Sequence, residues 1–171
     1  ELLELAAAQY GVFSTRQAAA VGIGKHSVAR RVRAGRYVRV SVGVYRIGGA
    51  SGSWEQRVMG AVLAGPPGSL ASHLTAARLW ALLAWDVRPC VTVPPNSSAT
   101  RVQGRVHRAP VHAQDRAVIR EIPVTSLART FVDLTGCRDA EQLGAMVDAA
   151  SRDHPMLLDD IERCLARLES G

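Results

Sequence analysis

The chain has almost no lysine, and its first third has almost no acidic residues. Lys25 is the only lysine among 171 residues, so 20 of the 21 basic residues are arginine. Residues 1–50 carry eight cations against Glu1 and Glu4, a net charge of +6, whereas residues 51–171 carry 13 arginines against 13 acids. The whole positive excess therefore lies in the first third. This asymmetry indicates a basic module joined to a neutral one, with nucleic acid as the expected anionic partner.

Cysteine is scarce and long apolar runs are missing. The cysteines Cys90, Cys137 and Cys164 are far apart and form no CxxC pair, so neither a disulfide framework nor a zinc site is indicated, and a reducing cytosol fits. The most apolar run, 74–85, is interrupted by Arg78 and is too short to span a bilayer, and no signal peptide is visible. We therefore expect a cytoplasmic protein with no membrane partner.

Patterns typical of catalysis are missing as well. His107, His112 and Cys90 lack metal-ligand spacing. Ser72 and His73 are adjacent, which rarely gives nucleophile–base geometry, so Ser72 is predicted to be a helix N-cap. The chain has no Walker-type loop and no group of acids followed by a lysine, as a metal nuclease needs. The sequence thus predicts no catalytic residue, no metal site and no cofactor.

One internal stretch, 124–134, combines several polar groups on a predicted helix. Arg129 and Asp133 are four residues apart, the spacing of a structural ion pair. A phosphate bound at the N-terminus of this helix, which Ser126 caps, is the alternative function of the stretch.

The N-terminal part predicts three short helices. The first is expected over about 2–10. Ser14 and Gln17 form a capping box for a second helix over about 15–21, and a third follows a Gly-Ile-Gly turn over about 25–34. Two short helices joined by a glycine-containing turn, the later one basic, are typical of a helix-turn-helix.

After the third helix the apolar residues recur with period two. Residues 37–40 and 44–47 alternate on either side of a turn and predict a β-hairpin. A hairpin directly after a recognition helix is the wing of a winged helix-turn-helix. The Gly/Ser run at 48–53 is the expected domain boundary, giving a DNA-binding domain at 1–50 and a second domain at 51–171.

The second part predicts a small α/β domain with a short sheet and flanking helices, so the fold class of the whole chain is α+β. Its helices are expected over about 54–64, 73–84, 126–136, 139–150 and 156–168, and its strands over about 88–93, 104–109, 116–119 and 122–125.

The predicted third helix has an apolar side and a cationic side. At 100° per residue, Val28 and Val32 point toward the core with Ala29 beside them. We expect the opposite side to enter the major groove of DNA, where Arg30 or Lys25 can contact guanine. The DNA-binding residues predicted on this helix are Lys25, His26, Ser27, Arg30, Arg31 and Arg33.

The wing and the start of the second helix are expected to contact the DNA backbone. A charged helix side is normally just solvated, but a solvated surface mixes both signs of charge. The segment from Arg16 to Arg46 contains no acid, which favours an anionic partner. The residues predicted for these contacts are Thr15, Arg16, Arg36, Arg39 and Arg46.

Three blocks of the N-terminal part, GVFSTRQ (11–17), SVARRVRAGR (27–36) and GVYRIG (43–48), closely resemble the winged-helix domain of AbiEi-type antitoxins of bacterial type IV toxin–antitoxin systems. Two later blocks, LASHLTAARLWAL (70–82) and IPVTSLARTFVDL (122–134), are similar to the next domain of a large actinobacterial group that carries this antitoxin domain. The resemblance extends over nearly the whole chain.

The resemblance implies a cytoplasmic, nucleoid-associated bacterial protein that binds double-stranded DNA. Such antitoxins repress their own operon, here through an operator expected to be an inverted repeat, and counteract a nucleotidyltransferase-like toxin. A homodimer on the DNA is compatible with this function. Many proteins of the group continue into a restriction-endonuclease-like domain, so the alternative is the DNA-targeting portion of a nuclease whose catalytic domain is missing from this chain. An interaction domain that binds RNA or an acidic protein is a third alternative.

Overall fold

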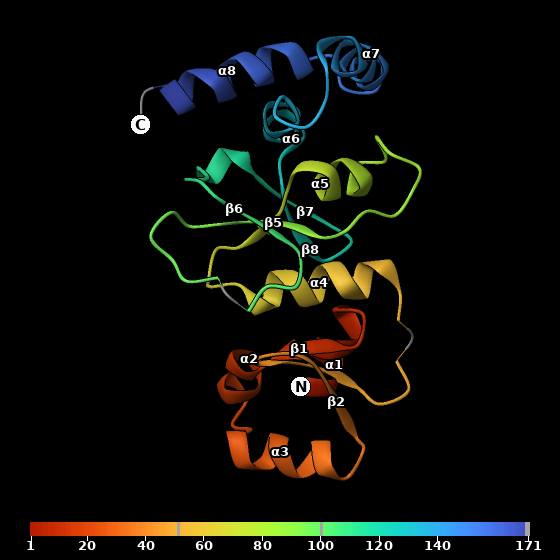
Figure 1. Ribbon diagram of the computed structural model, residues 1–171, viewed down its shortest axis with the longest axis vertical. Helices are drawn as coiled ribbons and strands as arrows, with labels where there is room; N and C mark the ends of the chain where they lie inside the picture. The colour runs from red at the N-terminus through yellow and green to blue at the C-terminus, as the bar shows by residue number, and fades with distance from the viewer. Residues whose placement is uncertain (51, 100, 170–171) are drawn as a thin grey trace.

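The computed structural model describes residues 1–50, 52–99 and 101–169. Two separate sheets are stacked along the long axis of the molecule with one helix between them (Figure 1). The α+β fold class predicted from the sequence is confirmed. Within the described ranges, no helix combines the length and the apolar character that crossing a bilayer requires.

The N-terminal part contains three helices and a three-stranded antiparallel sheet in the order β1-β3-β2. Its elements are α1 (Leu2–Ala8), β1 (Val12–Ser14), α2 (Thr15–Ala20), α3 (Lys25–Arg33), β2 (Tyr37–Ser41) and β3 (Val44–Ile47). The predicted helices and hairpin are confirmed to within two residues at each end. The sequence did not predict β1, because three consecutive buried residues show no alternation.

The predicted capping box at the start of α2 is confirmed. The Ser14 hydroxyl accepts a hydrogen bond from the Gln17 N–H at 3.2 Å, and the Ser14 N–H donates to the Gln17 side chain at 2.9 Å. The neighbouring Phe13 is fully buried, with its ring 4.9 Å from that of Tyr37 and 5.9 Å from that of Tyr45. The start of α2 is thereby held against the hairpin.

The second part is built on a five-stranded sheet in the order β6-β5-β4-β8-β7, in which β5 and β6 are parallel, β4 and β8 are parallel, and the other pairs are antiparallel. Its elements are α4 (Trp54–Ala64), β4 (Leu70–Ala71), α5 (His73–Leu79), β5 (Cys90–Val93), β6 (Arg105–Arg108), the 3-10 helix η1 (Ala113–Asp115), β7 (Arg116–Ile119), β8 (Ile122–Thr125), α6 (Leu127–Leu134), α7 (Ala140–Ser151) and α8 (Leu157–Glu169).

Three features of this part differ from the prediction, and one of them is the three-residue helix η1, which was not predicted. The two-residue strand β4 was not predicted, since so short a segment has no readable periodicity. The helix expected over 73–84 ends at Leu79 because Ala81 adopts a left-handed conformation with φ 61°, and the Leu82 N–H turns back to the Ala77 carbonyl. This sharp end leaves Trp80 at the corner between α5 and the following loop.

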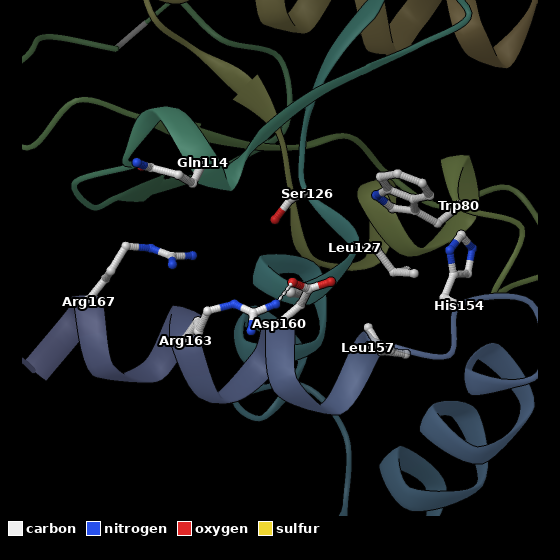
Figure 2. Close-up of a pocket in the computed structure, with 10 residues that line it drawn as sticks. Trp80, Gln114, Ser126, Leu127, His154, Leu157, Asp160, Arg163 and Arg167 are labelled. Atoms are coloured by element: carbon white, nitrogen blue, oxygen red, sulfur yellow. Dashed lines mark hydrogen bonds and ion pairs between the residues drawn. The ribbon is translucent and has the colours of Figure 1, made fainter.

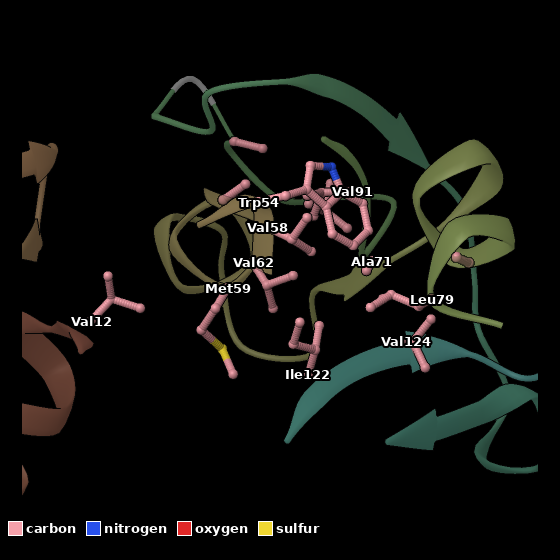
Figure 3. Packing of buried hydrophobic residues seen from close by; sticks show 14 residues of the cluster. Val12, Trp54, Val58, Met59, Val62, Ala71, Leu79, Val91, Ile122 and Val124 are labelled. Carbon is pink, nitrogen blue, oxygen red and sulfur yellow. The ribbon is translucent and has the colours of Figure 1, made fainter. Parts of the chain in front are cut away.

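Helix α4 packs against both sheets. On the side of the larger sheet, Trp54 and Val58 lie beside Val91 of β5 and close to β8 (Figure 3). Val12 of β1 belongs to the same buried cluster, so the core continues from one sheet to the other through α4. Burial of each such aliphatic side chain contributes about 1.5–3 kcal/mol. The larger sheet therefore supports the N-terminal helices through a packed core and not only through a linker.

Candidate nucleic-acid interface

Helix α3 is attached to the N-terminal core by one side. Val28 is buried and Val32 is half-buried, and both pack in the cluster that contains Phe13. Ala29, which was predicted to lie beside these valines, is exposed. It is one residue on from Val28, a rotation of about 100° that takes it out of the contact with the core.

The opposite side of α3 is open to solvent and cationic. Lys25, His26, Arg30 and Arg33 are all exposed. Within the parts of the chain that the structure describes, none of these four side chains forms a hydrogen bond or an ion pair. Their charges are thus uncompensated. His26, Arg30 and Arg33 lie together on the side away from the valines, whereas Lys25, seven residues before Val32, lies at the N-terminal end of α3 on the side of the valines.

Ser27 and Arg31 lie on the flank of α3 that faces β2. The Arg31 guanidinium donates a hydrogen bond to the Ser27 hydroxyl and lies 5.9 Å from the centre of the Tyr37 ring. Both side chains are half-buried. The bond to Ser27 and the contact with Tyr37 hold the Arg31 side chain in one position. The sequence did not predict this, because Tyr37 lies on β2, outside the helix.

Two of the arginines predicted to contact the DNA backbone instead donate hydrogen bonds to carbonyl groups of the protein. Arg16 at the start of α2 donates to the Gly65 carbonyl at 2.9 Å, which connects α2 to the end of α4. Arg46 in β3 donates to the Ala50 carbonyl at 2.8 Å and is paired with Val12, on the side of the sheet that faces α4. The sequence contains no signal for these bonds, since any backbone carbonyl can accept them.

The other predicted contacts of the hairpin remain at the surface. Arg36 and Arg39 are exposed, and the Arg39 side chain makes one long hydrogen bond of 3.4 Å to the Ser41 carbonyl. Thr15 is half-buried, and its N–H donates to the Gly43 carbonyl at the tip of the hairpin. The start of α2 and the hairpin tip therefore lie together.

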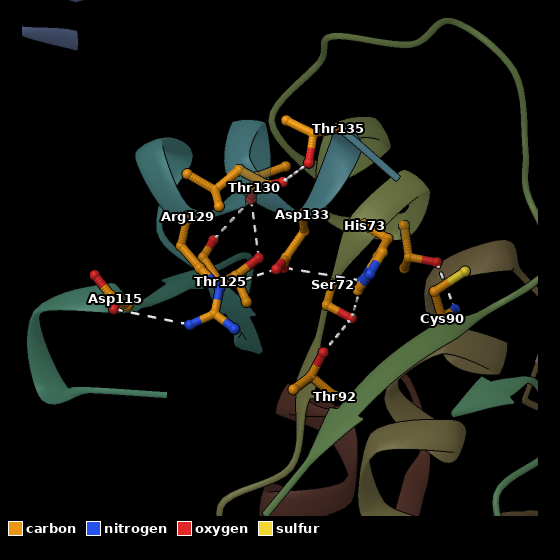
Figure 4. Close-up of polar contacts among 12 residues, drawn as sticks. Ser72, His73, Cys90, Thr92, Asp115, Thr125, Arg129, Thr130, Asp133 and Thr135 are labelled. Carbon is orange, nitrogen blue, oxygen red and sulfur yellow. Dashed lines mark hydrogen bonds and ion pairs between the residues drawn. The ribbon is translucent and has the colours of Figure 1, made fainter. Parts of the chain in front are cut away.

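A second group of polar residues lies between the larger sheet and α6 (Figure 4). The Ser72 hydroxyl is 3.0 Å from Nδ1 of His73 and accepts a hydrogen bond from Thr92 at 2.8 Å. The same nitrogen of His73 is 3.8 Å from Asp133 Oδ2, and the ring stacks on His107 at 3.5 Å. The prediction that Ser72 occupies the N-cap position of α5 is confirmed. Its hydroxyl makes no cap bond, however, and lies instead beside the ring of His73, whose backbone is left-handed (φ 53°).

This arrangement does not have the properties of a working nucleophile and base. Burial, together with the charges of Arg129 and Arg105, lowers the pKa of His73 to about 4, so the imidazole is neutral near pH 7. Its contact with Asp133 is therefore not an ion pair at that pH. Ser72 is fully buried, which keeps a substrate away from its hydroxyl. The group is best described as a polar connection between α5, β5 and α6.

The ion pair predicted within α6 is confirmed and belongs to a larger network. Arg129 Nε donates to Asp133 at 2.9 Å, and the same guanidinium donates to the Pro110 carbonyl at 3.1 Å and lies 3.9 Å from Asp115. Asp115 also accepts a hydrogen bond from Arg167 of α8. The network is buried and ties η1 and α8 to α6.

A pocket of about 390 Å³ lies at the N-terminus of α6, where the sequence offered a phosphate as an alternative (Figure 2). Arg163 and Arg167 project into it from α8, but Arg163 pairs with Asp160 at 2.5 Å and Arg167 with Asp115. The Ser126 hydroxyl already accepts the Arg129 N–H. Each cation at the pocket is matched by a carboxylate, so the pocket lacks the excess positive charge seen on α3.

A comparison with known protein families finds a match in the part of the chain that contains the exposed cationic side of α3. Residues 1–48 match the family described as transcriptional regulator, AbiEi antitoxin. We call residues 1–48, which match this family, the AbiEi segment. The matched residues run from α1 to the end of β3, so the AbiEi segment contains the helix-turn-helix and the hairpin.

The AbiEi match ends before α4. No curated protein matches the chain. The likeness of residues 70–82 and 122–134 to the second domain of the actinobacterial group therefore stays a prediction. Sequence reasoning also missed Gln56 and Gln103, which connect the AbiEi segment to the rest of the chain by hydrogen bonds to the Tyr10 and Val40 carbonyls.

Proposed function

We propose that this protein is a sequence-specific binder of double-stranded DNA that represses its own operon as an antitoxin of the AbiEi type. In this proposal residues 1–50 form the DNA-binding domain and residues 51–171 the second domain. The observation that carries the proposal is the exposed, uncompensated cationic side of α3 within a segment that matches a family of transcriptional regulators.

The exposed side of α3 is the surface that reads bases. In a helix-turn-helix, residues near the N-terminus of the second helix reach base edges in the major groove. Lys25 and His26 lie in the first turn of α3, and Arg30 lies farther along its exposed side. A bidentate arginine–guanine pair contributes about 1–3 kcal/mol of discrimination. We assign Arg30 to such a contact, with Arg33 beside it.

The hairpin and the flank of α3 supply contacts to phosphates, which add affinity without reading sequence. Arg36 and Arg39 are exposed beside α3 and have this role. Arg31 is held by Ser27 and stands over Tyr37, which suits a fixed contact to one phosphate. Arg16 and Arg46 fix the start of α2 and the hairpin through their hydrogen bonds to carbonyls. Because their guanidinium groups make these bonds, they contribute less to the affinity for DNA.

Two variants distinguish the contacts to bases from the contacts to phosphates. Arg30→Ala is expected to weaken binding to the DNA upstream of the protein's own gene by about 1–3 kcal/mol and to leave binding to a random duplex nearly unchanged. Arg39→Ala is expected to weaken both alike. Fluorescence anisotropy titrations of both variants with both duplexes provide the measurement. A loss of equal size on the two duplexes for Arg30→Ala would show that α3 does not read bases.

The second domain is proposed to bind the toxin, and the protein to act in the bacterial cytoplasm, on the nucleoid, without a catalytic step or a cofactor. A pair of protomers on an inverted repeat is the expected arrangement on the operator. Co-expression with the product of the adjacent gene tests this part. A nucleotidyltransferase-like partner that co-purifies with residues 51–171 supports it, and an adjacent gene product that never associates contradicts it.

A further inference from the structure

A second stretch of the chain is basic and free of acids, although the second part as a whole is neutral. From Val87 to Gln114 the chain contains four arginines and no aspartate or glutamate. The balancing acids of residues 51–171 lie mainly elsewhere, with eight of the 13 between Asp139 and Glu169. Residues 51–171 therefore have a net charge of zero but a local excess of positive charge between Val87 and Gln114. The four arginines are Arg88, Arg101, Arg105 and Arg108.

Three of these arginines lie on or just before an edge strand. β6 pairs with β5 alone and forms one border of the larger sheet. Arg105 and Arg108 are exposed at its two ends, while Val106 and His107 between them are half-buried. Arg101, four residues before the strand, is exposed as well. In the described residues, the structure shows no hydrogen bond or ion pair from these three guanidinium groups.

The border of the sheet is joined to the hairpin of the AbiEi segment. The Gln103 side chain donates to the Val40 carbonyl of β2 at 3.0 Å. Val40 directly follows Arg39, and Gln103 lies two residues from both Arg101 and Arg105. In Figure 1, β6, α2 and the N-terminal end of α3 all lie on the left of the view. The hydrogen bond thus brings the turn before β6 next to strand β2 of the hairpin.

We propose that β6 and the turn before it form a second phosphate-contacting surface, which holds the same duplex whose bases α3 reads. This inference rests on the proposed function. Side chains alternate along a strand, so Arg105 and Arg108, three residues apart, lie on opposite sides of β6. Arg108 shares the side of Val106, which packs on the core around α4, and Arg101 lies in the turn before the strand. A duplex carries one charge per about 1.7 Å of its axis. Several phosphates therefore fall within reach of this surface, and the contact adds affinity without sequence preference.

The other reason for charge on an edge strand is protection, because charged side chains prevent an open edge from pairing with another chain. The two roles predict different effects of salt. Each phosphate contact that is lost flattens the plot of log K against log salt by about 0.9, whereas a purely protective charge leaves that slope unchanged. Salt dependence therefore decides between them.

The test compares two double variants of the full chain on a 30-base-pair duplex of random sequence. Arg101→Ala with Arg108→Ala removes the cation of the turn and the strand cation on the side of α4, and Arg152→Ala with Arg163→Ala removes the same charge from the exposed helices at the end of the molecule farthest from α3. We expect the β6 variant to bind more weakly, with a salt slope flatter by about 1.8, and the control variant to keep the wild-type slope. Equal slopes for both variants would overturn the inference.

A measurement on the unmodified protein removes the dependence on how the variants fold. Amide hydrogen exchange of residues 101–108 is expected to slow when the random duplex is added, as β6 becomes covered. Unchanged exchange there, with slower exchange in α3, would overturn the inference and leave the proposed function standing. Failure of the wild-type chain to bind either its own upstream DNA or the random duplex would instead refute the proposed function itself.

Discussion

His73 makes the free energy of unfolding depend on pH. Burial and the charges of Arg129 and Arg105 lower its pKa to about 4 in the folded state, whereas an imidazole in an unfolded chain has a pKa near about 6.5. As the pH falls below about 6.5, the unfolded state therefore takes up a proton before the folded state does. The stability that depends on neutral His73 is complete above that pH and is lost progressively down to about pH 4.

Two neighbours modify this dependence. Burial also lowers the pKa of His107, which adds to the loss of stability as the pH falls. Burial raises the pKa of Asp133, so its protonation favours the folded state and partly offsets the loss at the acidic end of the range.

We expect a His73→Gln variant to show a smaller fall in Tm between pH 7 and pH 5 than the wild-type protein, because it removes the buried imidazole. His112 is an exposed histidine, and His112→Gln provides the matched control, with the full wild-type fall. Thermal unfolding followed by circular dichroism at the two pH values measures the difference. An identical fall in all three proteins would show that His73 does not govern the acid response.

Prediction from the sequence succeeded for residues whose position depends on their own helix. Periodicity placed Val28 inward and Arg30 outward, and both positions are found. It could not place Arg31 or Arg16, because their partners Tyr37 and Gly65 belong to other elements. The role of an arginine depends on the carbonyl or ring that folding brings to it, and sequence spacing contains no such information.

At the scale of elements, Asp115 joins three segments that are distant in the chain. It lies at the end of η1 and is fully buried, with Arg129 of α6 and Arg167 of α8 as its cationic neighbours. A buried carboxylate of this kind stabilises the fold mainly because its removal leaves a buried cation without compensation.

Asp115→Asn is expected to lower the free energy of unfolding by about 3 kcal/mol, since it leaves Arg129 buried with only Asp133 beside it. Asp160→Asn breaks an exposed pair with Arg163 and is expected to cost less than about 1 kcal/mol. Urea unfolding of both variants measures the two values. Similar losses for the exposed and the buried pair would contradict this interpretation of the network.

The elements that the sequence failed to predict are the shortest ones. The three-residue β1 and the two-residue β4 owe their conformation to partners in β3, β5 and β8. The longer helices α4, α6, α7 and α8 begin within a residue or two of their predicted starts. The predicted cap Ser126 accepts a hydrogen bond from an N–H of the first turn, as Ser53 and Asp139 also do in α4 and α7. Capping is a local property and could be predicted, whereas strand pairing is not local.

At the scale of the whole molecule, the AbiEi segment is fixed to the second part. The core through α4 is reinforced by hydrogen bonds from Tyr10 to the Arg120 carbonyl at 2.8 Å and from Gln103 to the Val40 carbonyl at 3.0 Å. The placement of α3 relative to β6 is therefore set by the fold. The proposed contact of two separated basic surfaces with one duplex requires such a fixed geometry.

Charge is also distributed unevenly along the molecule. The basic helix α3 lies at one end, and α7 and α8 lie at the other end (Figure 1). The region from Asp139 to Glu169 carries eight acids against three arginines. A polyanion attracts the first end and repels the second. In the proposed complex this distribution orients the protein on approach, with the acidic end facing away from the duplex.

The central claim is sequence-specific DNA binding, and one measurement tests it most directly. The dissociation constant of the wild-type protein is determined at one fixed physiological salt concentration for the DNA upstream of its own gene and for a scrambled duplex of equal length and composition. The proposed repressor is expected to bind its own DNA at least about 1,000 times more tightly. Equal affinity for the two duplexes would contradict it.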